Sequence, residues 1–296
     1  MDKLSRGYTD SLKVISALLV VIGHYASSSI IHGWSTSPIW YVLASQCGYI
    51  GVAVFFFLSG YGLSESDKKH HLSINEFIKK RFLKIYKPVL LVTAIWLTIE
   101  YTLMRKSIGW HIFYDMFWGF DDGVLWFVKI LFGLYAAFFI FSQFCNNDRY
   151  KAGWSILILS SIILMYIANI TDGYSSIAIP CFTLGVFYSR SHNQWHTLTL
   201  MVVALCCSVV YTMITKDNHG LHAAINYSLL IAAILIFNKV QCVRYTKMYN
   251  SKCIALCGVI SFDLYLTHFK VMESLIYYKC YFGGVILLLL YQFVLL

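Results

Sequence analysis

The stretch LKVISALLVVIGHYASSSII, residues 12–31, decides the fold class of this chain. A helix needs about 20 predominantly apolar residues to cross the hydrocarbon core of a bilayer, and this stretch supplies them. The sequence is cut by polar breaks into nine further candidate spans, at residues 39–64, 88–104, 124–145, 152–170, 174–189, 197–215, 221–238, 254–272 and 280–296. We therefore predict an all-α, polytopic integral membrane protein with about ten transmembrane helices. The sixth span is short and contains Pro180.

The composition excludes a water-soluble protein. Hydrophobic residues make up 59% of the 296 residues, against roughly 45–50% in globular domains. Charged residues make up only 12%, which is too few to cover a globule with polar surface. Because the chain has 3 prolines and no long charged or low-complexity run, it leaves no room for a linker or a second domain. Residues 1–296 are therefore predicted to form one membrane domain.

The excess of basic residues follows the expected topology. The chain holds 23 Lys and Arg against 14 Asp and Glu, a net charge of +9. A cytoplasmic N-terminus puts 17 of the basic residues in cytoplasmic segments and 5 outside, as the positive-inside rule requires. Ten spans then leave both termini cytoplasmic, and the membrane accounts for the charge without a nucleic acid partner. The 9 cysteines show no C-x-x-C or Cys/His ligand spacing, so we expect no metal site.

Two ionisable side chains stand out in the first span, because lipid disfavours such groups. Lys13 and His24 are eleven residues apart, which on a helix is about 16 Å along the axis and about 20° around it. Both therefore point to the same side, with His24 in the outer half of the span. A buried neutral imidazole there is able to act as a general base. The alternative, a histidine hydrogen-bonded between helices to a Tyr or Ser, carries equal weight on the spacing alone.

The ninth span contains SFDLYLTH, residues 261–268. Ser261, Tyr265 and His268 fall at positions i, i+4 and i+7 and share one helix face. This span also runs from inside to outside, so His268 reaches a depth similar to that of His24, and the two imidazoles could line one outward cavity together with Tyr265. The simpler interpretation of His268, which the spacing alone favours, is an interfacial residue in an aromatic belt.

A basic segment precedes the third span. It ends in FIKKRFLKIYKP, residues 77–88, and the spacing predicts that Lys80, Arg81, Lys84 and Lys87 lie on or near one side of a helical turn at the cytoplasmic surface. Such a cluster suits a polyphosphate, because guanidinium and ammonium groups make charge-assisted bonds to phosphate oxygens. The alternative is that the run serves only the positive-inside rule and anionic lipid, as most juxtamembrane basic runs do.

Small residues and a tryptophan mark two further spans. GYIGVAVFFFLSGYGLS, residues 48–64, holds Ser59 and Gly60 among its small side chains. These allow close helix contact or let a slender ligand pass near the backbone. LWFVKILFGLY, residues 125–135, puts Trp126 at the outer edge of the fourth span, where an interfacial tryptophan is ordinary.

Taken together, these segments resemble the acyltransferase family 3, the bacterial membrane acyltransferases that O-acetylate lipopolysaccharide, capsule and exopolysaccharide. The first-span pattern of that family corresponds to TDSLKVISALLVVIGH, residues 9–24, and its second element to FFFLSGY, residues 55–61. Three further matches follow in the order of the family: Arg81 with Lys84, Trp126, and Ser261 with Tyr265 and His268. The chain resembles the short subgroup without a fused SGNH hydrolase domain.

Two departures from the pattern of the family are visible. Lys13 and Lys84 replace the commoner arginines, which keeps the charge but loses the bidentate fork. The fourth span also lacks the acidic W-S-L-x-x-E-E segment of longer members.

The resemblance implies transfer of an acyl group, in the first place acetyl, from cytoplasmic acyl-CoA across the membrane. The acceptor would be a hydroxyl of a cell-envelope or secreted polysaccharide or of its lipid-linked precursor. Acyl-CoA, with acetyl-CoA as the first candidate, is then a donor substrate, and no cofactor stays bound. The expected location is the cell inner (plasma) membrane, with membrane lipid and the glycan acceptor as partners and no particular oligomeric state implied.

The resemblance also implies roles for individual residues. It implies that His24 and Lys13 act in catalysis. It implies donor binding by Arg81, Lys84, Ser59 and Gly60, and acceptor binding by Trp126, Ser261, Tyr265 and His268. Direct attack by the acceptor hydroxyl and an acyl-histidine intermediate both fit this set. The alternative function is a transporter or flippase of a glycan pathway without acyl transfer. Inverted repeats would support that alternative, and the sequence shows none.

Overall fold

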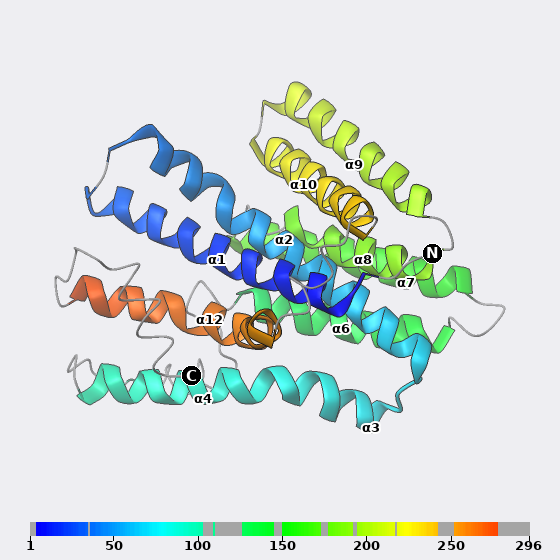
Figure 1. Ribbon diagram of the computed structural model, residues 1–296, viewed down its shortest axis with the longest axis horizontal. Helices are drawn as coiled ribbons and strands as arrows, with labels where there is room; N and C mark the ends of the chain where they lie inside the picture. Colours follow the sequence, from blue (N-terminus) through cyan, green and yellow to red (C-terminus); the bar gives the residue numbers. More distant parts are fainter. Residues whose placement is uncertain are drawn as a thin grey trace.

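The computed structural model of the chain describes residues 4–34, 36–102, 109, 126–144, 150–172, 177–191, 194–216, 218–241 and 252–277. Every regular element in these residues is helical (Figure 1). In chain order the elements are α1 (Arg6–Ile31), α2 (Pro38–Lys69), α3 (Ile74–Phe77), the π-helical turn η1 (Ile78–Phe82), α4 (Leu83–Thr102), α6 (Trp126–Phe144), α7 (Tyr150–Asp172), α8 (Pro180–Arg190), α9 (Gln194–Thr215), α10 (Asn218–Gln241) and α12 (Lys252–Tyr277).

Among the described residues, seven helices are long and apolar enough to cross a membrane. They coincide with the first to fifth, the seventh and the ninth of the predicted spans, which confirms an all-α, multi-pass integral membrane protein. The predicted sixth span differs, because α8 has only 11 residues, about 16 Å of helix. At the predicted eighth span, 221–238, the apolar part of α10 is Leu221–Ile236, which is shorter than the helices counted above. The tenth, 280–296, lies outside the described residues, so the count of ten and the sidedness of the termini stay predictions.

Helix α2 is the centre of the packing. It packs along α1 and along α8, and α1 in turn packs against α12 (Figure 1). Two further pairs, α6 with α7 and α9 with α10, complete the bundle. The segments that carry the predicted site residues therefore lie on helices that contact one another or share α2 as a neighbour.

Glycines let α2 come close to both neighbours. At the crossing with α1, a Cβ added to Gly23 would lie 2.7 Å from the backbone nitrogen of Gly48. At the crossing with α8, a Cβ on Gly60 would overlap the carbonyl oxygen of Phe182. Small residues permit such approach in lipid, where helix association depends largely on van der Waals packing. Of the two interpretations of the small residues, close helix contact accounts for Gly60.

Local signals set the starts of several helices. The hydroxyl of Ser5 accepts a hydrogen bond of 3.3 Å from a backbone N–H one turn into α1. Pro38 begins α2, at a position where its missing N–H is no loss. Ser73 and Glu76 form a capping box at the start of α3. From there α3, η1 and α4 follow without a break, so the basic segment is part of one helical rod.

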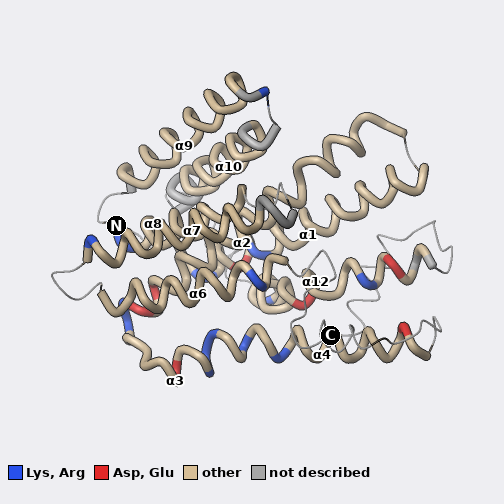
Figure 2. Tube along the Cα trace, turned by 180° about the vertical axis from the view of Figure 1, so that it is seen from behind, with Lys and Arg blue, Asp and Glu red and all other residues tan. Residues whose placement is uncertain are grey.

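Basic side chains gather at one end of the bundle. Figure 2 shows Lys and Arg concentrated along η1, which follows α3, and the first part of α4, and near the N-terminus. This is the end that the positive-inside rule assigns to the cytoplasm. We use "inner" for it and "outer" for the opposite end.

The crossing of α2 and α8 can be tested with one methyl group. Gly60→Ala is expected to lower the apparent melting temperature of the detergent-purified protein by several degrees, because helix backbone cannot rotate away from the new Cβ. Overpacking of this kind costs about 1–3 kcal/mol. Gly62→Ala is the matched control, since nothing lies within 4 Å of a Cβ there. Thermal unfolding followed by size-exclusion chromatography measures both, and equal melting temperatures would contradict the contact.

Candidate active site

His24 and His268 meet between α1 and α12. Their ring centroids lie 5.1 Å apart, with the ring planes tilted by 48°. His24 is partly exposed, and the ring of Phe269 stands edge-on to it at 5.6 Å. The structure thus brings together the two histidines for which the sequence predicts similar depths.

His268 is buried and is not an interfacial residue of an aromatic belt. The residue as a whole is only 1% exposed. Its Nδ1 lies 2.6 Å from the carbonyl oxygen of Tyr265, one turn earlier on α12. The Nε2 atom is also buried and has no hydrogen-bond partner in the part of the chain that the structure describes. The simpler interpretation of His268 from the sequence is therefore wrong.

An aromatic cluster joins three of the segments that carry the family resemblance. The ring of Tyr265 on α12 lies 5.2 Å from Phe127 on α6 and 6.2 Å from Phe55 on α2. Phe56 contacts the same α6 segment, 4.8 Å from Phe127 and 6.3 Å from Trp126. These centroid distances are those of ordinary aromatic packing. The FFFLSGY, LWF and SFDLYLTH segments therefore meet at one place beside His268.

Two of the residues predicted to bind the acceptor are buried. Tyr265 is 2% exposed and Ser261 is 3% exposed. The hydroxyl of Ser261 donates to the carbonyl oxygen of Gly258 at 2.8 Å, within its own helix. Trp126, in contrast, is partly exposed, at the start of α6.

An ion pair occupies the inner end of α1. The ammonium of Lys13 lies 2.8 Å from Oδ1 of Asp10, and the guanidinium of Arg6 lies 3.8 Å from Oδ2. Asp10 is buried against α12. A Cβ added to Gly258 of that helix would lie 2.6 Å from the Cβ of Asp10. Since Lys13 and His24 are about 16 Å apart along the helix, Lys13 bonds towards the inner surface and does not reach the imidazole.

The basic segment does not present one cluster of four cations. Arg81 lies within the π-helical turn Ile78–Phe82, and it turns towards α2, where its Nη2 donates to the hydroxyl of Ser66 at 2.5 Å. Lys80 instead pairs with Glu76 at 3.2 Å, and Lys84 and Lys87 are exposed. A π-turn adds a residue to the turn and so rotates the side chains before it relative to those after it. The four cations therefore differ in partners and exposure, and the prediction that they share one side stays a prediction.

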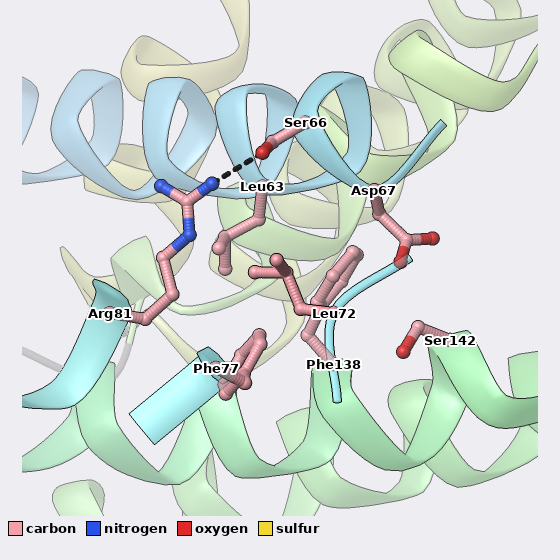
Figure 3. Close-up of a pocket in the computed structure, with 8 residues that line it drawn as sticks. All are labelled: Leu63, Ser66, Asp67, Leu72, Phe77, Arg81, Phe138 and Ser142. Carbon is pink, nitrogen blue, oxygen red and sulfur yellow. Dashed lines mark hydrogen bonds between the residues drawn. The ribbon is translucent and has the colours of Figure 1, made fainter. Parts of the chain in front are cut away.

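Arg81 lines a narrow pocket between α2, η1 and α6 (Figure 3). The cavity has a volume of about 10 Å³, close to what one water molecule needs. The Nε atom of Arg81 is buried without a hydrogen-bond partner among the described residues. Tyr135 on α6 lies within hydrogen-bond reach of Ser59, while Gly60 faces α8. The lining residues are Leu63, Ser66, Asp67, Leu72, Phe77, Arg81, Phe138 and Ser142.

A second arginine reaches the same end of α2. Nε of Arg190, at the end of α8, donates to the hydroxyl of Ser64 at 3.0 Å, and its Nη2 donates to Asp67. Asp67 also lies 2.9 Å from Nδ1 of His71 and lines the Arg81 pocket. Sequence reasoning treated Arg190 only as one of the cytoplasmic charges. No spacing along the chain signals a contact between residues so far apart, because it depends on how α8 crosses α2.

The comparisons with known proteins agree with the geometry of the segments. The family model described as an acyltransferase domain matches residues 6–296. The chain belongs to the acyltransferase 3 family. It is therefore a membrane acyltransferase, an enzyme that uses an acyl donor. The same comparisons found no similar curated protein and no similar solved structure.

The candidate site of this acyltransferase has two parts. The outer part is the pair His24 and His268 with its aromatic surroundings, and the inner part is the Arg81 pocket. Lys13 lies between the His24 level and the inner surface on α1. Among the described residues, no three His, Cys, Asp or Glu side chains are grouped so as to hold a metal ion.

The inner end can be tested through Arg190. Arg190→Met is expected to destabilise the acyltransferase by about 1–3 kcal/mol, because it leaves Asp67, only 12% exposed, without its guanidinium. Lys80→Met is the matched control, since both partners of that pair are well exposed and such pairs contribute little. Apparent melting temperatures in detergent measure the difference. An Arg190→Met protein as stable as the Lys80→Met protein would mean that the ion pair does not fix α8 on α2.

Proposed function

We propose that this acyltransferase moves an acyl group from cytoplasmic acyl-CoA, with acetyl-CoA as the first candidate, to a hydroxyl of a cell-envelope or secreted polysaccharide or its lipid-linked precursor. The observation that carries the proposal is the imidazole pair of His24 and His268 inside the bundle, with the basic pocket of Arg81 at the inner end. A group able to accept a proton thus lies towards the outer end, and a group able to bind phosphate lies at the inner end, which the positive-inside rule assigns to the cytoplasm.

The inner pocket supports a donor with phosphates. The present partner of Arg81 is the neutral hydroxyl of Ser66, and a phosphate oxygen would make the stronger, charge-assisted bond in its place. Because the pocket has room for about one water molecule, donor binding must part α2 and the η1 turn. Lys84, exposed one turn further, would add positive charge at the entrance.

The acyl-bearing arm would run from Arg81 along the Ser59 side of α2 towards His24. The Gly60 side of α2 is filled by α8, whereas Ser59 lies beside Tyr135 on α6. Lys13 lies about 16 Å below His24, so its role would be to steady the donor. It is too far away to stabilise the charge that develops at the reacting carbonyl.

The chemistry proposed at His24 balances without an added reactant. In direct transfer, a lone pair of His24 takes the proton of the acceptor hydroxyl while the oxygen bonds to the thioester carbon. The carbon–sulfur bond then breaks, and the thiolate takes the proton from the imidazolium. In the acyl-histidine route the same nitrogen bonds the acyl carbon first and the carbon–sulfur bond breaks to release the thiolate. The acceptor oxygen then bonds the acyl carbon as the carbon–nitrogen bond breaks, and the hydroxyl proton passes to the thiolate.

The acceptor would approach from the outer side. Trp126 is partly exposed where α6 begins, and an indole ring there suits contact with a sugar face. Tyr265 belongs to the same aromatic cluster, and both it and Ser261, one turn earlier on α12, are buried. We propose that they shape this surface from below while Trp126 makes the contact.

The proposed function is tested in a deletion strain of the host complemented with wild type, His24→Ala or His32→Ala. His32 is an exposed histidine beyond the outer end of α1, so its loss controls for removal of a histidine as such. We expect mass spectrometry of the surface polysaccharide to show an acyl increment with wild type and His32→Ala, and none with His24→Ala at equal protein levels.

Each other outcome has a distinct meaning. An increment that survives in His24→Ala would remove this histidine from the mechanism. A second outcome combines two results: the wild-type complement shows no acyl increment, and the deletion strain fails to bring the polysaccharide to the surface. This outcome would favour a transporter or flippase over acyl transfer to this acceptor.

A further inference from the structure

We propose that His268 is a positioning residue whose Nε2 accepts a hydrogen bond from the ring N–H of His24 and thereby fixes which nitrogen of His24 carries the lone pair. The inference rests on the proposed function, because it concerns the histidine through which the acyl transfer is proposed to run. It changes the role of His268 from a group that binds the acceptor to one that acts through His24.

The first step is the protonation pattern of His268 itself. Its Nδ1 lies 2.6 Å from the carbonyl oxygen of Tyr265. A carbonyl oxygen only accepts hydrogen bonds, so Nδ1 must be the donor and carry the proton. In the neutral ring the other nitrogen, Nε2, then carries a lone pair. The backbone of α12 therefore makes His268 a hydrogen-bond acceptor with a fixed direction.

The buried Nε2 of His268 needs a hydrogen-bond donor. His268 is 1% exposed, and its Nε2 is buried with no partner in the described part of the chain. A buried polar atom without a partner is costly, and more so inside a membrane where water is scarce. Such an atom calls for a donor during the working cycle of the enzyme.

His24 lies close enough to His268 to be that donor. The ring centroids of His24 and His268 are 5.1 Å apart. Two imidazoles joined by an N–H···N bond of about 2.9 Å have their centroids roughly 5 Å apart, so a rotation of the partly exposed His24 ring is enough to form the bond. The ring of Phe269 packs on His24 in an edge-to-face arrangement, with ring centroids 5.6 Å apart.

The consequence concerns the reacting nitrogen. When one nitrogen of His24 donates to His268, the other nitrogen carries the lone pair and faces the substrates. That nitrogen takes the hydroxyl proton and returns it to the thiolate in direct transfer, or bonds the acyl carbon in the acyl-histidine route. His268 stays neutral and exchanges no proton in either route, so the inference holds for both. The tautomer of a histidine is commonly set by the hydrogen bond of its second nitrogen.

The test compares His268→Phe with His268→Gln in the purified full-length protein in proteoliposomes, with labelled acetyl-CoA and surface polysaccharide of the host as substrates. Phe keeps a ring in the packed site but offers no acceptor, whereas the Gln side chain carries a carbonyl oxygen near the place of Nε2. We expect His268→Phe to lower kcat about tenfold or more, because a wrong tautomer removes the base. The KM for acetyl-CoA should stay within about twofold, and His268→Gln should recover most of kcat.

A spectroscopic readout separates positioning from mere packing. In protein labelled with ¹⁵N-histidine, His24 of the wild type is expected to show one tautomer, and His24 of His268→Phe a mixture of both. A wild-type His24 that populates both tautomers equally would overturn the inference even if the Phe variant failed to fold. A His268→Phe protein with the kcat of the wild type would also overturn it.

His24→Ala in the same assay distinguishes this inference from the proposed function. If His24→Ala is inactive while His268→Phe is fully active, only the positioning role falls. If His24→Ala keeps its activity, His24 leaves the mechanism and the inference falls with it, while a wild-type protein that transfers no acyl group would contradict the proposed function itself.

Discussion

The close contact of α2 with α1 and with α8 is the constraint on which the rest of the structure depends. Gly23 against Gly48, and Gly60 against Phe182, remove the side chains that would otherwise hold these backbones apart. With α2 fixed in this way, its paired phenylalanines reach the aromatic residues of α6 and α12, and its inner end meets two arginines. The contact also sets the rotation of α1, so that His24 faces α12. The glycines therefore act on the site through helix geometry and not through contact with a substrate.

Lipid explains how the polar side chains are arranged. Because the hydrocarbon core offers no water, buried polar groups are expected to find partners within the protein. Asp10 has Lys13 and Arg6, and the hydroxyl of Ser261 bonds within its own helix. Nε2 of His268 is one of several buried polar atoms without a partner among the described residues, but it lies beside His24, where the segments that carry the family resemblance converge. That location is what sets the position apart from ordinary helix packing.

Much of the fold could be predicted from the sequence, because each span is encoded locally by its run of apolar residues. The similar depth of His24 and His268 was also predictable from the helical rise, but their contact was not, since the spacing alone favoured an interfacial His268. Contacts between distant segments were not predictable. The π-turn that rotates Arg81 towards α2 leaves no mark in a pattern of charges, and the pair of Asp67 with Arg190 depends on the crossing of two helices. The shortness of α8 was indicated only by the brevity of its apolar run.

The central claim is that a donor on the cytoplasmic face supplies an acyl group to a hydroxyl on the opposite face. Sealed membrane vesicles of both orientations test it most directly, with host polysaccharide enclosed in everted vesicles or placed outside right-side-out ones, and with labelled acetyl-CoA, which does not cross membranes, added outside. The account predicts label in the enclosed polysaccharide of everted vesicles that contain the wild-type protein, and no label in right-side-out vesicles. Label only where donor and polysaccharide share one side of the membrane would contradict it.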